Sequence, residues 1–130
     1  MTKPEIQKLI GLFPEIYSLE TGYWAGSGWL DLVLSLSIDL SALSKKHNAK
    51  IRCIEFKEKF GRLKYWAVCD KEVWTETHRL LNAAEKESLK TCELCGCPGV
   101  LGCDTGKYRT LCKACGPGYA PVAPADDPLL

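Results

Sequence analysis

The chain has 130 residues, of which 46% are hydrophobic and 25% charged, with eight cysteines and a formal net charge of +1 at pH 7. This composition is typical of a globular protein with room for one core and a small additional module, and it excludes an intrinsically disordered chain. The near-zero net charge excludes the global basic field that drives generic nucleic-acid binding.

The N-terminal third predicts two helices. Thr2 and Glu5 have the spacing of a capping box, and apolar residues at helical spacing follow them. Next comes a glycine- and aromatic-rich stretch, residues 21–29, which we expect to be a loop. Ser27 is the predicted N-cap of a second helix over about residues 28–46.

The middle of the chain predicts a β-hairpin and a third helix. Residues 50–57 and 62–69 alternate and are rich in aromatic and β-branched side chains, with a Phe60-Gly61 turn between them. A two-residue and a three-residue loop would pair the strands differently, so the pattern leaves the register and the buried face open. Asp70 is the predicted cap of a helix over about residues 71–91.

Two Cys-x-x-Cys-Gly motifs follow this helix. Each motif forms a tight turn that aims two sulfurs at one point, and their separation fits a tetrahedral S4 metal site. A closed S4 shell has no open coordination position, which indicates a structural metal. We expect zinc, with iron in the same shell as the alternative. The predicted ligands are Cys92, Cys95, Cys112 and Cys115.

Four further cysteines lie outside this set. Cys97 and Cys103 fall between the motifs, where either could replace a ligand, or the two could pair if oxidised. We interpret them as packed or free thiols. Cys53 and Cys69 belong to the hairpin, and we expect them to be buried as small hydrophobic side chains.

Together these elements predict an α+β fold with N-terminal helices, a β-hairpin, a long helix and a C-terminal zinc ribbon. We expect three segments along the chain. They are a helix–helix–hairpin–helix core over residues 1–91, a zinc-ribbon module over residues 92–116 packed on it, and a flexible Pro-rich tail over residues 117–130.

The sequence also predicts a cytoplasmic location. The apolar run over residues 29–40 is short and contains Asp31 and Asp39, so it indicates a buried helix and not a membrane span. The N-terminus lacks the basic and apolar regions of a signal peptide. This absence and the spacing of the cysteines favour a reducing cytosol and thiolate ligation over disulfides, and we expect no membrane partner.

Basic residues concentrate around the hairpin. Residues 45–64 contain eight Lys or Arg against two Glu, with aromatic residues between them. Such pairing can hold phosphates while aromatic rings stack on bases. The alternative is a solvated strand face, because lysines on edge strands also prevent aggregation. The predicted macromolecule-binding residues are Arg52, Lys57, Lys59, Arg62, Lys64, Tyr65, Lys107 and Arg109.

Three segments carry a resemblance to a known family. Residues 57–65, 88–99 and 109–115 are similar to the motifs K-E-K-F-G-x-L-R-F-Y, S-L-x-x-C-E-x-C-G-x-P-G and R-T-L-C-x-x-C of a family of small phage and prophage proteins. Relatives often have His where this chain has Cys115, and this exchange implies that Cys115 is a ligand. The resemblance implies a phage protein in the cytoplasm of a bacterial host, and it implies no mechanism.

We therefore predict a zinc-containing protein that acts by binding a macromolecule and is not an enzyme. The first hypothesis is a phage accessory protein that binds nucleic acid through the basic hairpin. The alternative is an anti-defence inhibitor, for example of the anti-CRISPR type, that binds a host protein complex. A small enzyme or redox protein ranks third, because neither His47 nor His78 lies in a catalytic motif. We expect no small-molecule substrate.

Overall fold

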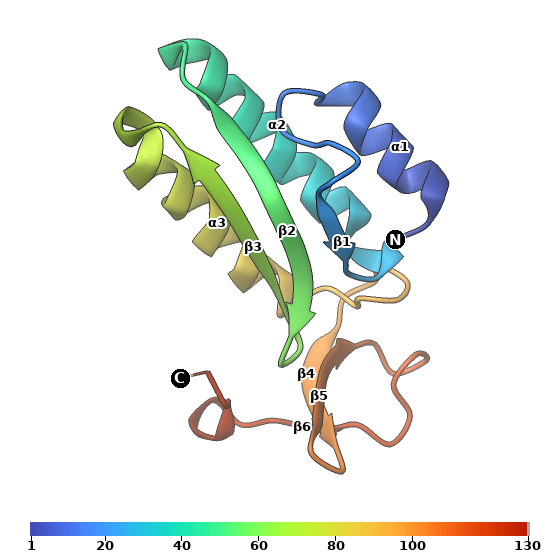
Figure 1. Ribbon diagram of the computed structural model, residues 1–130. Helices are drawn as coiled ribbons and strands as arrows, with labels where there is room; N and C mark the ends of the chain where they lie inside the picture. Colours follow the sequence, from blue (N-terminus) through green and yellow to red (C-terminus); the bar gives the residue numbers. More distant parts are fainter. Residues whose placement is uncertain (130) are drawn as a thin grey trace.

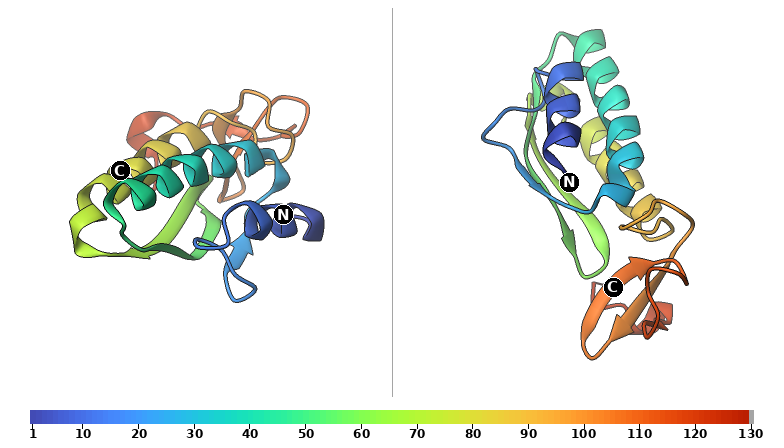
Figure 2. Two further views of the ribbon diagram at one scale, coloured as in Figure 1. Left: turned by 90° about the horizontal axis from the view of Figure 1, so that it is seen from above. Right: turned by 90° about the vertical axis from the view of Figure 1, so that its right-hand side faces the viewer.

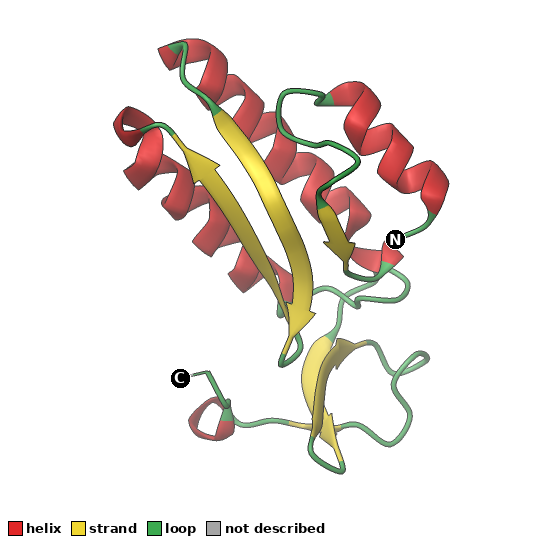
Figure 3. Ribbon diagram, in the orientation of Figure 1, coloured by secondary structure: helices red, strands yellow, loops and turns green. Residues whose placement is uncertain are grey.

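The computed structural model describes residues 1–129 and confirms the α+β fold (Figure 1). Within that range, three α-helices and a three-stranded sheet form the core, and a second three-stranded sheet forms a separate C-terminal lobe (Figure 3). No helix in the described range is long and apolar enough to cross a membrane. The helices and strands are α1 (Lys3–Leu12), β1 (Gly22–Trp24), α2 (Leu30–His47), β2 (Ile51–Lys59), β3 (Arg62–Cys69), α3 (Trp74–Ser88), β4 (Val100–Asp104), β5 (Lys107–Leu111) and β6 (Ala120–Pro121).

The capping pattern at the N-terminus is confirmed, whereas two other predicted caps are wrong. Thr2 caps α1, and Glu5 completes the capping box. Ser27 lies inside a short 3₁₀ helix, and its hydroxyl donates a hydrogen bond to the Glu5 carboxylate. Asp70 precedes a second 3₁₀ helix without capping it, because its carboxylate accepts the backbone N–H of Lys50. In both cases the side chain forms a hydrogen bond with a residue distant in the sequence and does not cap the helix.

The β2–β3 hairpin is confirmed, and the structure fixes its register. Lys59 pairs with Arg62, so the turn has two residues, Phe60 and Gly61, with φ of +49° and +80°. Positive φ at both positions gives a turn of the I′ class, which matches the right-handed twist of the strands. A bulge at Ile54 shifts the pairing by one residue between Cys53 and Glu55.

The loop predicted over residues 21–29 contains a short strand instead. Residues Gly22–Trp24 form β1, which pairs in parallel with β2 and gives the order β1-β2-β3. Three residues are too few to show a period of two, so this strand depends on its partner and has no local sequence signal.

Helices α2 and α3 lie on one side of this sheet (Figure 2). The sheet buries Ile51, Cys53, Phe56 and Leu63 against them. Trp29, which immediately precedes α2, is the largest fully buried side chain. No helix of the described chain covers the opposite side of the sheet (Figure 2). We call that side the outer face.

The C-terminal lobe, residues 92–121, is called the ribbon below. It contains both cysteine motifs and a sheet of order β5-β4-β6. Helix α3 ends at Ser88, three residues earlier than predicted, and a short turn leads to Cys92. The ribbon lies below the turn of the β2–β3 hairpin (Figure 1).

The tail differs from its predicted form. Residues 120–121 form β6 on β4, and a 3₁₀ helix follows over Pro124–Asp126. Asp127 then forms an ion pair with Arg62 of the hairpin. The composition of the Pro-rich tail predicts neither contact. Strand β6 pairs with β4 through backbone groups, and the ion pair joins residues that are 65 positions apart.

Candidate functional site

The four predicted cysteine ligands meet at one point of the ribbon. The sulfurs of Cys92, Cys95, Cys112 and Cys115 all lie within 4.8 Å of one another, and those of Cys95 and Cys112 are 3.6 Å apart. A metal with bonds of about 2.3 Å to four tetrahedral sulfurs requires sulfur–sulfur distances of about 3.8 Å. This cluster could therefore hold one metal ion.

Backbone geometry aims the sulfurs. In each motif the N–H of the glycine after the second cysteine donates to the carbonyl of the first, at 2.9 Å for both Gly96 and Gly116. Gly96 has φ of +81°, a conformation that glycine adopts at low cost. Gly116 needs no positive φ, but a side chain there would lie 2.8 Å from Leu111. The local backbone geometry thus explains why a glycine follows the second cysteine in both motifs.

The cluster also shifts the pKa values of its thiols. Burial opposes ionisation of Cys92, yet backbone N–H groups, that of Cys112 foremost, lower the pKa of its thiol from 9.0 to about 6. The backbone N–H of Cys115 likewise lowers the pKa of Cys112. The pKa of Cys115 is raised by its side-chain hydrogen bond with Cys112. The pKa is thus lowered for one thiol of each motif, Cys92 and Cys112, and raised for the other, Cys95 and Cys115.

The remaining cysteines stay outside the cluster. Cys97 is exposed, Cys103 faces Tyr108 across the ribbon sheet, and neither joins the four sulfurs. Cys53 is buried and Cys69 partly buried in the hairpin. All eight cysteines are free thiols.

Glu93 joins the ribbon to the core, and sequence reasoning did not identify it. Its side chain is 5% exposed and accepts the N–H of Gly26 at 3.0 Å and the guanidinium of Arg109 at 2.7 Å. Its carbonyl accepts the N–H of Gly28 at 2.7 Å. A Cβ at Gly26 or Gly28 would lie 2.5 Å or closer to the backbone of this motif, so only glycine allows this approach. The one sequence signal was the pair of glycines around Ser27.

The outer face of the core sheet forms a second candidate site. Its side chains alternate with the buried ones along β2 and β3, and Trp24 joins them because it pairs with Lys57. Trp24 is 69% exposed and Trp66 60%. In strand geometry their Cα atoms lie about 12 Å apart, with β2 between them. The outer face comprises Trp24, Arg52, Glu55, Lys57, Lys59, Lys64, Trp66 and Val68.

Gly22 lets the Trp24 indole lie on the sheet. A Cβ at Gly22 would come within 2.6 Å of the indole Nε1 and 3.0 Å of the Glu55 Cβ. The ring therefore rests over the glycine backbone and presents its other side to solvent. An indole held in this way is ready to stack on a planar ligand.

Three predicted binding residues are not freely exposed. Arg62 is 3% exposed and paired with Asp127, and Arg109 is paired with the buried Glu93. Tyr65 points to the inner side of the sheet, where its hydroxyl donates to the Tyr17 hydroxyl at 2.9 Å. These contacts hold the fold together. Alternation could not place Tyr65 while the register was open, and it gives no sign of the ion pairs of Arg62 and Arg109, whose partners lie more than 15 residues away along the chain.

The other predicted residues remain on the surface. Lys57 and Lys64 are partly exposed and form ion pairs with Glu55 at 3.3 Å and Glu85 at 2.7 Å. Arg52, Lys59 and Lys107 are exposed, and none of them forms an ion pair within residues 1–129. Lys107 begins β5 and belongs to the ribbon, not to the outer face.

A cleft of about 460 Å³ borders the outer face where β3 meets α3. Its wall on β3 includes Trp66, and its wall on α3 includes His78 and Asn82. The cleft combines an aromatic ring, polar side chains and lysines. Its basic lining residues are Lys57, Lys59, Lys64 and His78.

Replacing Asp127 by Asn is expected to destabilise the protein by about 3 kcal/mol. Arg62 would keep its charge while buried and would lose its counter-ion. Urea unfolding followed by circular dichroism measures the change. Asp126→Asn is the matched control, because Asp126 is exposed and should shift stability by no more than about 0.5 kcal/mol. Equal effects of the two changes would contradict a structural role for the ion pair.

The same ion pair predicts a pH dependence. Burial opposes the charge of Asp127, but the Leu129 N–H and Arg62 together hold its pKa below the ordinary 3.8. The stabilisation is therefore complete above that value and is lost as the pH falls through the lower folded value. Unfolding free energies of the wild type and Asp127→Asn, measured from neutral pH downward, should converge in acid.

Comparison with known proteins finds no matching family model, no matching curated protein and no matching solved structure. The likeness to small phage proteins therefore stays a prediction that rests on the motifs in residues 57–65, 88–99 and 109–115.

Proposed function

We propose that this protein is a zinc-stabilised binding protein that holds single-stranded nucleic acid on the outer face of its core sheet. The supporting observation is the exposure of Trp24 and Trp66 on a sheet face that also carries Arg52, Lys57, Lys59 and Lys64. Aromatic side chains stack on bases of any sequence, and lysines that follow the backbone neutralise phosphates.

The arrangement fits a single strand better than a duplex. A duplex hides the faces of its bases in the stack, whereas the two indoles need free base faces. Trp24 and Trp66 lie on different strands, and Lys57 lies between them on β2. A strand that crosses the sheet from β1 to β3 would place bases on the rings and phosphates near the lysines.

Zinc is the metal we propose for the cluster. Four thiolates complete its tetrahedral shell, and Glu93 of the first motif joins the ribbon to the core. The closed shell leaves no coordination position for a reactive water, and for this reason we propose binding without turnover. The setting we propose is that of a phage accessory protein in a bacterial cytoplasm.

A protein partner is the second candidate, and one observation favours it. Four of the seven basic residues among the predicted binding residues, Lys57, Arg62, Lys64 and Arg109, are already paired with carboxylates. These ion pairs lower the net positive charge with which the surface could bind a polyanion. The exposed apolar side chains of Trp24, Trp66 and Val68 would then contribute a larger share of the binding. An anti-defence protein that binds a host complex would use such an apolar surface.

Binding of fluorescein-labelled single-stranded DNA and RNA, measured by anisotropy across a salt series, tests the first candidate. Trp66→Ala is expected to weaken binding about tenfold or more, because it removes one stacking contact. Replacing Lys57, Lys59 and Lys64 by Gln should make the slope of log K against log salt shallower by about 2.

Two variants control for nonspecific effects. Ile38→Ala removes an exposed apolar side chain from α2, and replacing Lys3, Lys8 and Lys86 by Gln removes the same charge away from the outer face. Both should bind as the wild type does. If no single strand binds at low salt, nucleic-acid binding is wrong, and the protein partner becomes the leading candidate.

A further inference from the structure

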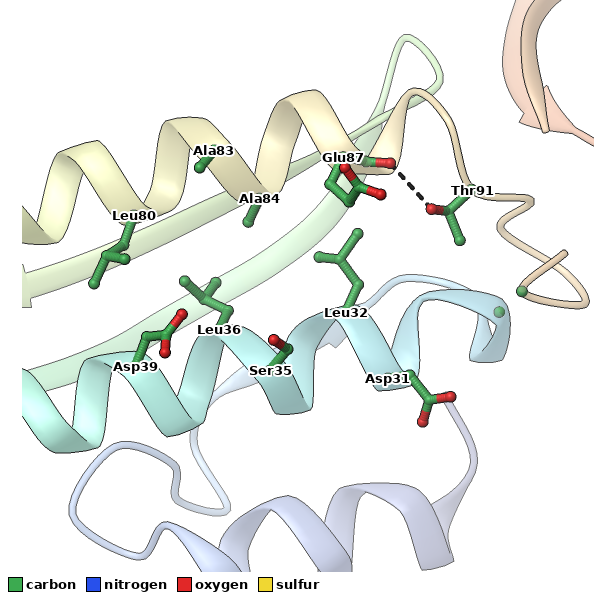
Figure 4. Close-up of a pocket in the computed structure, with 12 residues that line it drawn as sticks. Asp31, Leu32, Ser35, Leu36, Asp39, Leu80, Ala83, Ala84, Glu87 and Thr91 are labelled. Atoms are coloured by element: carbon green, nitrogen blue, oxygen red, sulfur yellow. Dashed lines mark hydrogen bonds between the residues drawn. The ribbon is translucent and has the colours of Figure 1, made fainter. Parts of the chain in front are cut away.

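A groove of about 420 Å³ runs between α2 and α3, whereas the outer face belongs to the sheet on the other side of these helices (Figure 2). Leu32 and Leu36 of α2 point toward α3, and Leu80 of α3 points toward α2 (Figure 4). Small side chains accompany them, including Ser35 and Ala83. The floor of the groove is therefore apolar and shallow enough for close approach.

The residues of the groove follow helical spacing on both walls. On α2 they continue from Asp31 to Asp39 at steps of three and four, and on α3 from Leu80 to Glu87 in the same way. These nine residues of α2 extend about 12 Å, or just over two helical turns. A groove between two helices with this spacing accepts the side-chain ridge of a third helix.

The charged residues of the groove are all acidic. Asp31, Asp39 and Glu87 line it, and no Lys, Arg or His does. None of these three carboxylates forms an ion pair with any residue from 1 to 129. Arg79, whose charge interacts with Asp39, is already paired with Glu76 at 2.8 Å. The rim thus offers three carboxylates that no ion pair among residues 1–129 engages.

We propose that this groove binds an amphipathic helix of a partner protein, with apolar residues at i, i+4 and i+7 and Lys or Arg on both flanks. Apolar side chains of the helix would contact Leu32, Leu36 and Leu80, and its cations would reach the acidic rim. The inference does not depend on nucleic-acid binding, because the groove and the outer face share no residue.

A helix from a second copy is a poor occupant. Among the described residues, α2 and α3 form the groove themselves, and α1 buries Leu9 in its own core. The 3₁₀ helices have three residues each, too few to span two turns. The acidic rim therefore favours a basic helix from another protein chain.

The test uses a fluorescent 15-residue helical peptide with Leu at i, i+4 and i+7 and Lys on both flanks. Anisotropy should show saturable binding to the full chain, whereas a peptide with Glu in place of each Lys should not bind. Replacing Asp31 and Asp39 by Asn and Glu87 by Gln should weaken binding about tenfold, as expected for three ion pairs on a rim. Removing the same charge through Glu20→Gln, Glu72→Gln and Asp126→Asn should leave it unchanged.

Steric variants complete the test. Ser35→Trp and Ala83→Trp each fill the groove from an exposed position, and each should abolish peptide binding without loss of helical circular dichroism. Equal binding of the Lys and Glu peptides, or unchanged binding by both Trp variants, would overturn the proposal. So would self-association in sedimentation experiments that Ser35→Trp abolishes, because the groove would then belong to a second copy.

Discussion

Removal of the metal is expected to unfold the ribbon and to lower the stability of the whole chain. Metal binding contributes on the order of 10 kcal/mol to the folding of comparable small zinc modules. Without the ion, four sulfur atoms would lie within 4.8 Å of one another with no bond to hold them together. A strong chelator added to the purified protein should therefore cause loss of the ribbon strands, followed by circular dichroism and by proteolysis within residues 92–121.

The loss should spread to the core because the ribbon shares hydrogen bonds with it. The Trp29 indole donates to the Thr91 carbonyl at 2.8 Å, and Gly28 donates to Glu93. On the other side, the Thr110 hydroxyl donates to the Gly61 carbonyl at 2.6 Å, in the turn of the hairpin. The core thus loses contacts at two places when the ribbon unfolds, and its unfolding midpoint should fall.

Cys92→Ser gives the same prediction without a chelator. Cys92 is fully buried, so its variant should lose the metal and unfold the ribbon. Cys97→Ser is the matched control, since Cys97 is exposed and lies outside the cluster. Metal analysis should find about one zinc per chain in the wild type and the control, and none in Cys92→Ser. A protein that is free of metal and fully folded would refute the metal site.

Local chemistry explains which parts of the structure the sequence could predict. The capping box of Thr2 and Glu5, the Phe60-Gly61 turn and the four cysteines each act over a few residues. Each of these residue types favours the local conformation that its motif needs, so the motif in the sequence predicts the conformation. The α+β class follows once such elements are placed in order.

Contacts between distant residues explain which parts of the structure the sequence could not predict. β1 forms because β2 pairs with it. The Glu93 carboxylate is buried where it accepts hydrogen bonds from Gly26 and Arg109, and Asp127 covers Arg62. Each partner lies more than 15 residues away along the chain. A count of basic residues treats all of them as exposed, yet Arg62 and Lys64 lie two residues apart on the same face of β3, and it is Asp127 of the tail that covers Arg62.

Replacement of Trp29 by Ala is expected to cost about 3–5 kcal/mol. Trp29 is 0% exposed and belongs to the hydrophobic core, so truncation leaves a large cavity. It also leaves the Thr91 carbonyl without its indole donor. Urea unfolding of Trp29→Ala and of Trp24→Ala, which removes an indole that is 69% exposed, gives the comparison. The second change should stay within about 0.5 kcal/mol of the wild type.

Trp29→Phe separates the hydrogen bond from the packing. Phenylalanine keeps most of the buried ring but has no N–H, so the variant should lose about 1 kcal/mol from the bond to Thr91, plus a smaller packing loss. If the indole couples core and ribbon, Trp29→Phe should also release metal to a chelator faster than the wild type, whereas Trp24→Ala should not. Equal metal release from all three proteins would show that Trp29 stabilises the core alone, and the coupling would then rest on Glu93 and Thr110.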